Sequence, residues 1–192
     1  MKSARARAAR TLLLAVSLVL SPLVLGCQAK SQGDCEPSER VVDPVLLAFL
    51  SQARSAHHTA DQREAQGDLG AAVTALERLT RAPRPPGEAP EVGEVLADTQ
   101  ARIADLLSRT GGFDQANRAV DAGLEQARAP SYFRGHLFEV RGLVEERLQK
   151  SLRDKARGPE ADQARERSLA AYEEAMKIQA EVIQKASPPA LR

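Results

Sequence analysis

Hydrophobic residues recur at intervals of three and four from residue 43 onward, a spacing that places them along one side of an α-helix. Glycine and proline residues interrupt this periodicity repeatedly, and helices are expected to end at those points. The pattern therefore predicts six helices. They run from Asp43-Pro44 to Gly67-Asp68, through 71–79, from near Pro90 to Gly111-Gly112, over 113–127, over 131–155, and from after Gly158-Pro159 to about 186.

Short turns between these helices predict an all-α fold made of three antiparallel helical hairpins. Composition agrees, because only 3% of the residues are aromatic and the commonest types favour helices over β-sandwiches or barrels. In the sixth helix, Leu169, Tyr172 and Met176 are expected to face the core. Its polar outer face is then expected to cap the array, with Arg165, Glu166, Glu173, Glu174 and Lys177 exposed.

The first 27 residues follow a different pattern: a basic start, an apolar stretch over 11–25, and Gly26-Cys27 at its end. This stretch is shorter than the about 20 residues needed to span a bilayer, and it suits the core of a signal peptide. The run 24–27 resembles the lipobox of bacterial lipoproteins, although Val24 and Leu25 depart from its usual residues. The resemblance implies that Cys27 is lipidated and becomes the first residue of the mature chain. An ordinary secretory signal or an uncleaved anchor is the alternative.

The lipoprotein interpretation divides the chain into a signal peptide (1–26), a lipidated cysteine with a flexible tether (27–42), a helical-repeat domain (43–187) and a short tail (188–192). Gln28 follows the cysteine, where the lipoprotein resemblance associates aspartate with retention in the inner membrane. The expected location is therefore the outer membrane, with the protein held by its lipid and facing the periplasm. Cys35 is then expected to be an exposed thiol without a partner in its own chain.

The predicted hairpins resemble one another and resemble the tetratricopeptide repeat, whose two helices pack through small residues. Ala72 and Ala116 follow similar glycine turns and are 44 residues apart, and Ser168 continues the series 52 residues later. Both intervals exceed the repeat's usual 34 residues. The resemblance implies a short solenoid of three stacked hairpins, and a generic helical bundle is the alternative.

The sequence contains no pattern that indicates catalysis, and the chain is not expected to be an enzyme or to need a cofactor. Its formal charge is +1 and becomes negative once the basic first 26 residues are removed, which gives no reason to expect nucleic-acid binding. His57, Asp61, His136 and Cys35 are the candidate metal ligands, but they lack the clustered spacing of a metal site. No metal is therefore expected.

The repeat resemblance implies a concave face lined by the first helix of each hairpin, where a partner peptide would bind. A mixed, mildly acidic groove of this kind would suit a basic or polar peptide. Its expected residues are Arg54, His57, Asp61, Glu64, Asp98, Asp105 and Arg109, followed less directly by Tyr132 and Glu139. The expected function is a non-catalytic, lipid-anchored adaptor that binds an envelope protein or peptide. A metal-binding or enzymatic accessory lipoprotein and a purely structural envelope spacer are the alternatives.

Overall fold

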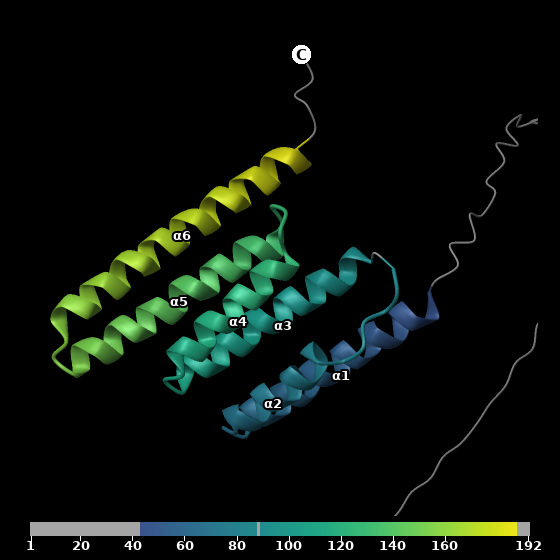
Figure 1. Cartoon of the computed structure of the whole chain (residues 1–192), viewed down its shortest axis with the longest axis horizontal. Coiled ribbons are helices and arrows are strands. Elements are labelled where there is room, and N and C mark those ends of the chain that lie inside the picture. Colours follow the sequence, from purple (N-terminus) through teal and green to yellow (C-terminus); the bar gives the residue numbers. More distant parts are fainter. Residues whose placement is uncertain (1–42, 88, 188–192) are drawn as a thin grey trace, which may run out of the picture. The chain divides into compact units, whose positions relative to one another are not determined.

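The computed structural model describes residues 43–87 and 89–187, and these ranges form six α-helices without a β-strand. The predicted all-α class is confirmed (Figure 1). The Cys27 lipobox, the tether with Cys35 and the tail lie outside the described residues. The helices are α1 (Pro44–Ala65), α2 (Leu69–Thr80), α3 (Pro90–Arg109), α4 (Phe113–Gln126), α5 (Tyr132–Asp154) and α6 (Gly158–Ala186).

The helix starts follow from the residue types predicted there. Asp43 caps α1 by accepting a hydrogen bond from the backbone amide of Val45 at 2.8 Å, and Pro44 occupies the first turn, where its missing amide proton costs nothing. The Ser131 hydroxyl caps α5 in the same way, at 3.2 Å from the amide of Arg134. Gly158-Pro159 lies in the first turn of α6 rather than in a break before it.

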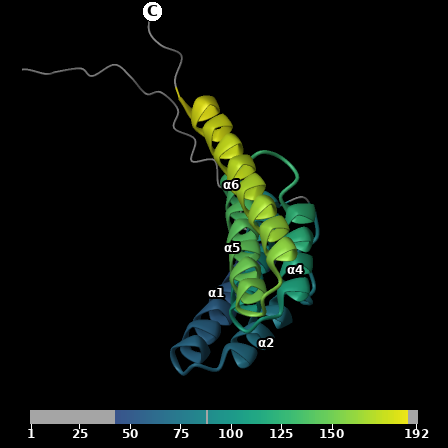
Figure 2. The ribbon, with the colours of Figure 1, turned by 90° about the vertical axis from the view of Figure 1, so that its left-hand side faces the viewer.

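Consecutive helices form the most extensive contacts, α1 with α2, α3 with α4 and α5 with α6 (Figures 1 and 2). In addition, α3 packs against α2, α5 and α1, and α4 packs against α5. Among the described helices, α6 contacts α5 alone.

The turns inside these three pairs have the same backbone geometry. A residue with positive φ follows the first helix: Gly67 at 77°, Gly111 at 85° and Ala156 at 55°. The next residue in each turn donates its amide proton to a carbonyl five positions earlier, at 2.9 to 3.0 Å, which closes the helix end. Alanine therefore occupies, in the third turn, the left-handed conformation that glycine adopts at no steric cost in the other two.

These turns define a register for the repeat. Counting from the positive-φ residue, the second helices carry buried alanines at matching positions: Ala72, Ala116 and Ala161, then Ala75, Ala119 and Ala164. Ser168, predicted to match Ala116, lies seven residues further along, so that predicted alignment is wrong. The third pair repeats after 45 residues and not after 52, because its turn is formed by Ala156 and not by Gly158.

The main core lies among α1 to α5 and is built from alanines interleaved with larger apolar residues. Leu76, Leu106 and Leu137 are fully buried there. A second cluster joins α1, α2 and the start of α3 around Phe49 and Leu96, and a third joins the end of α5 to the start of α6 around Leu152. Burial of this apolar surface holds the helices together.

The predicted inward face of α6 is wrong for Leu169 and Met176, although Tyr172 is half-buried against Gly142 of α5 as predicted. Leu169 and Met176 are 51% and 61% exposed, whereas the face against α5 consists mostly of small residues. These are Ala161, Ala164, Ser168, Ala171 and Ala175, with Ile178. On α5, Gly135 and Gly142 leave room for side chains of α6, because an added Cβ atom would lie 3.1 Å from Gln179 and 2.6 Å from the ring of Tyr172. Close packing against α5, rather than the hydrophobicity of single side chains, therefore decides which face of α6 is buried.

Candidate functional site

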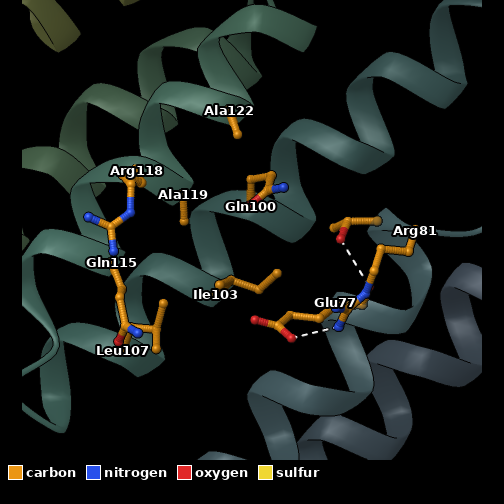
Figure 3. A pocket seen from close by; sticks show the side chains of 10 residues that line it. Glu77, Arg81, Gln100, Ile103, Leu107, Gln115, Arg118, Ala119 and Ala122 are labelled. Atoms are coloured by element: carbon orange, nitrogen blue, oxygen red, sulfur yellow. Dashed lines mark hydrogen bonds and ion pairs between the residues drawn. The ribbon is translucent and has the colours of Figure 1, made fainter.

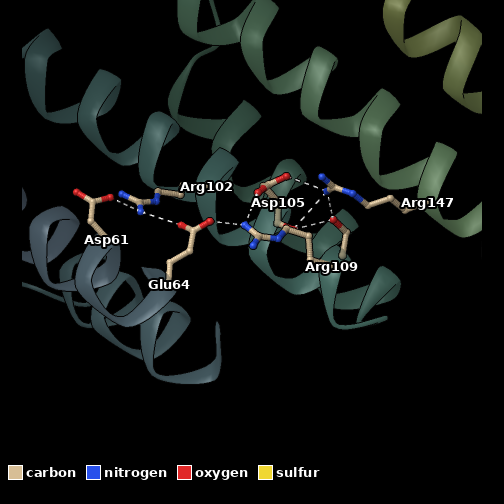
Figure 4. A network of polar contacts seen from close by, with 7 residues as sticks. Asp61, Glu64, Arg102, Asp105, Arg109 and Arg147 are labelled. Carbon is tan, nitrogen blue, oxygen red and sulfur yellow. Dashed lines mark hydrogen bonds and ion pairs between the residues drawn. The ribbon is translucent and has the colours of Figure 1, made fainter. Parts of the chain in front are cut away.

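Charged side chains on α1, α3 and α5 form a continuous series of ion pairs, here called the charged ladder (Figure 4). A guanidinium nitrogen of Arg102 lies 2.5 Å from Asp61 and 3.2 Å from Glu64, so one arginine of α3 binds two carboxylates of α1. Arg109 binds Glu64 as well and lies 3.7 Å from Asp105 on its own helix.

The charged ladder continues to α5 through Arg147. Its guanidinium donates hydrogen bonds to Asp105 at 2.8 Å and to the buried hydroxyl of Ser108 at 2.6 Å. The pairs Asp61–Arg102 and Asp105–Arg147 occupy equivalent positions in successive helix pairs. Asp105 follows Asp61 by 44 residues, and Arg147 follows Arg102 by 45. One ion pair of the ladder therefore recurs in two successive helix pairs.

The ladder carries three carboxylates and three guanidinium groups, so its charges balance. Arg102 and Arg147 were not among the predicted groove residues, and their presence cancels the mildly acidic character expected from the sequence. Hydrogen bonds from Arg109 and then Arg102 hold the pKa of Glu64 below its usual value, and the same pairing raises the pKa of Arg109. The side chains remain 23 to 60% exposed, so each pair contributes at most about 1 kcal/mol.

His57 of α1 forms a hydrogen bond to α3. Its Nε2 atom lies 3.0 Å from the hydroxyl of Thr99, which is buried and donates its own proton to the carbonyl of Val95 at 2.7 Å. The hydroxyl oxygen must therefore accept a hydrogen bond from the Nε2–H group of His57. Burial is the main cause of the lowered pKa of His57, with Arg102 also lowering it and Asp98 and Asp61 opposing the shift.

The other predicted groove residues lie on the same helices but outside the charged ladder. Arg54 is exposed and Asp98 half-buried, and neither forms an ion pair or side-chain hydrogen bond among residues 43–87 and 89–187. Tyr132 is 61% exposed at the start of α5, where its ring stacks on His136 at 6.0 Å. Glu139 accepts a hydrogen bond from Gln179 of α6 at 2.7 Å.

The candidate metal ligands are not brought together. His57 is bonded to Thr99, Asp61 to Arg102, and His136 lies 3.2 Å from Glu139. Within the described part of the chain, no group of three histidine, cysteine, aspartate or glutamate residues is arranged to hold a metal ion. Cys35 lies outside that part.

A buried carboxylate on α5 was not anticipated from the sequence. Glu145 is only 5% exposed, and its two oxygens accept hydrogen bonds from Asn117 of α4 and Arg167 of α6, both at 2.9 Å. Glu145 therefore connects three helices, and the two side chains satisfy a carboxylate that would otherwise be costly to bury. In the sequence, Glu145 and Glu146 are adjacent charged residues, and no signal distinguishes the buried one.

A pocket of about 350 Å³ lies among α2, α3 and α4, away from the predicted groove (Figure 3). Ile103, Leu107 and Ala119 give it an apolar floor, and Gln100, Gln115 and Arg118 are among its polar lining residues. At its edge, Arg81 pairs with Glu77 at 2.7 Å. This size falls at the lower end of the range for small-molecule sites.

Comparisons of the chain with protein-family models, with curated proteins and with solved structures found no match. None of the described helices combines the length and the apolar character needed to cross a membrane. The surfaces of the helical unit are therefore the basis for a functional proposal.

Proposed function

We propose that this protein is a non-catalytic, lipid-anchored adaptor of the bacterial cell envelope, built from tetratricopeptide-like helical repeats. The observation that carries the proposal is the repetition of one turn geometry, with left-handed residues at Gly67, Gly111 and Ala156. Stacked repeats of one supersecondary unit form extended surfaces that bind other proteins. A fold does not determine a function, and the partner therefore has to be found by experiment.

The proposed binding surface is the face formed by α1, α3 and α5 around the charged ladder. A partner with basic groups would compete with Arg102 and Arg109 for Asp61 and Glu64, whereas Arg54 and Asp98 offer charges without an internal partner among the described residues. Such a surface supports selectivity more than affinity, because exposed ion pairs contribute little net binding energy.

The proposed location is the periplasmic side of the outer membrane, with Cys27 carrying the lipid. Several acyl chains hold a protein on a bilayer far better than one, since each buried methylene contributes about 0.8 kcal/mol. The proposal rests on the resemblance of 24–27 to a lipobox and on Gln28.

Site-specific photo-crosslinking in intact envelopes tests the binding surface. A photoreactive residue at position 54 of α1 is expected to capture one reproducible protein, and the same residue at position 78 of α2 is the matched control. Both Arg54 and Arg78 are exposed and lack ion pairs within the described ranges. Equal capture from both positions, or none from position 54, would contradict the proposed surface.

Charge reversal separates the adaptor from the structural spacer. Arg54→Glu is expected to change capture of the partner, while Arg78→Glu leaves it unchanged, because only the first alters the charge of the proposed surface. Partner binding that persists in Arg54→Glu and in Arg109→Glu would favour a spacer without a specific groove.

A further inference from the structure

An exposed apolar stripe runs along α6. Leu169, Met176 and Ile183 are 51%, 61% and 67% exposed and follow one another at intervals of seven residues. Tyr172 and Ala180 lie between them, so five apolar residues recur at steps of three and four on one side of the helix. Leu169, Met176 and Ile183 keep the seven-residue period of a coiled-coil seam, Ala180 lies one residue beyond the strict seam position, and the stripe extends over about 21 Å.

The equivalent position of α4 is covered. Leu124 of α4 occupies the same place in the repeat as Leu169, 13 residues after the positive-φ residue, and packs into the main core beside α5. Among the described helices nothing lies on this face of α6, because α6 contacts α5 alone (Figure 1). The stripe is therefore a helix-packing surface without a helix on it.

Tyr172 fixes the edge of this surface. Its ring covers Gly142, and its hydroxyl donates a hydrogen bond to Glu146 of α5 at 3.1 Å. Burial beside α5, followed by the bond to Glu146, raises the pKa of Tyr172 to about 12.

We propose that the stripe on α6 binds the same stripe of a second copy of this chain, with the two helices antiparallel and Met176 at the two-fold axis. The spacing is symmetric about Met176, with apolar residues four and seven positions away on both sides. In this register Leu169 meets Ile183 of the other copy. Tyr172 meets Ala180, so the largest side chain of the stripe faces the smallest.

The charges beside the stripe are also self-complementary. Glu173 of one copy lies within two residues, or about 3 Å along the axis, of Lys177 of the other. Lys177 is 74% exposed in its intrahelical pair with Glu174 and can exchange partners at little cost. Arg165 lies opposite Ser187, at the C-terminal end of the other α6, where a cation is favourable beside the free carbonyl groups.

Sedimentation equilibrium of the full chain in density-matched detergent tests the proposal. The wild-type chain is expected to form a reversible dimer. Met176→Glu places two like charges opposite each other at the axis and is expected to raise the dimer Kd at least about tenfold. Ala170→Glu, which adds the same charge about 120° away on the same helix, is the matched control and is expected to leave the Kd unchanged.

Disulfide trapping tests the register. In a Cys35→Ser background, Met176→Cys is expected to crosslink to itself on oxidation, and Ala170→Cys is not. A mixture of Leu169→Cys and Ile183→Cys chains is expected to yield the mixed dimer, since these two positions meet in the antiparallel arrangement. Crosslinking of each of these variants to itself instead would indicate parallel helices and would contradict the register.

Three outcomes would overturn the proposal. The first is a wild-type chain that stays monomeric at all concentrations, and the second is a dimer that Met176→Glu leaves intact while thermal unfolding shows normal folding. The third is a monomer whose position 176 crosslinks only to a different envelope protein, which would assign the stripe to a partner helix.

Discussion

Gly123 allows α4 to lie close to both α3 and α5. A Cβ atom at this position would lie 2.5 Å from Leu137 and 3.1 Å from Gln100, well inside the 3.5 to 4.0 Å of a favourable carbon–carbon contact. Leu137 is fully buried and cannot move aside without disturbing the core. In Gly123→Ala, higher helix propensity should raise the free energy of unfolding by about 1 kcal/mol, and overpacking should lower it by about 1 to 3 kcal/mol. The expected result is a net loss of about 1 kcal/mol.

Gly93→Ala in α3 is the matched control. There the added Cβ meets only the carbonyl oxygen of Gln126 at 3.5 Å, an ordinary contact, so the substitution should stabilise the protein by about 0.5 to 1 kcal/mol. Urea unfolding followed by far-ultraviolet circular dichroism measures both changes. A Gly123→Ala protein at least as stable as the wild type, with Gly93→Ala behaving as expected, would refute the close approach of α4 to α5.

Three further predictions concern single side chains. Cys27→Ser should leave helix content unchanged but abolish membrane attachment and accumulate as precursor, as fractionation and mass spectrometry of the N-terminus would show. Glu64 binds fewer protons in the folded state because its pKa is lowered, so its stabilising effect is present above pH 4.5 and is lost as the pH falls through the folded-state pKa. Glu64→Gln should therefore weaken the acid dependence of the free energy of unfolding. Glu145→Ala should lower the free energy of unfolding, measured in urea, by about 2 kcal/mol, because Asn117 loses its hydrogen-bond partner. Glu145→Gln should lower it by less.

The helices and their ends could be predicted because local residues decide them. Gly67 and Gly111 adopt the left-handed conformation that ends a helix, and Asp43 caps the helix that it precedes. The third turn could not be placed, since Ala156 adopts a conformation that sequence rules assign to glycine.

The buried face of α6 and the composition of the charged ladder could not be predicted, because both depend on neighbouring helices. The side of α6 that is buried depends on α5, where Gly135 and Gly142 leave room for Gln179 and for the ring of Tyr172. Arg102 and Arg147 look like ordinary exposed arginines in the sequence, and only the packing of α3 against α1 and α5 brings them to Asp61 and Asp105.

The charged ladder also has a consequence for mechanical behaviour. The contact of α1 with α3 is the least extensive of the helix contacts, and the exposed pairs of Arg102 and Arg109 with α1 lie across it. Salt weakens such pairs, since the screening length is about 8 Å at physiological ionic strength. As ionic strength rises, the α1–α2 pair would therefore be held to the rest of the unit mainly by its apolar packing against α3. Its amide protons would exchange with solvent before those of α5, where Glu145 links three helices.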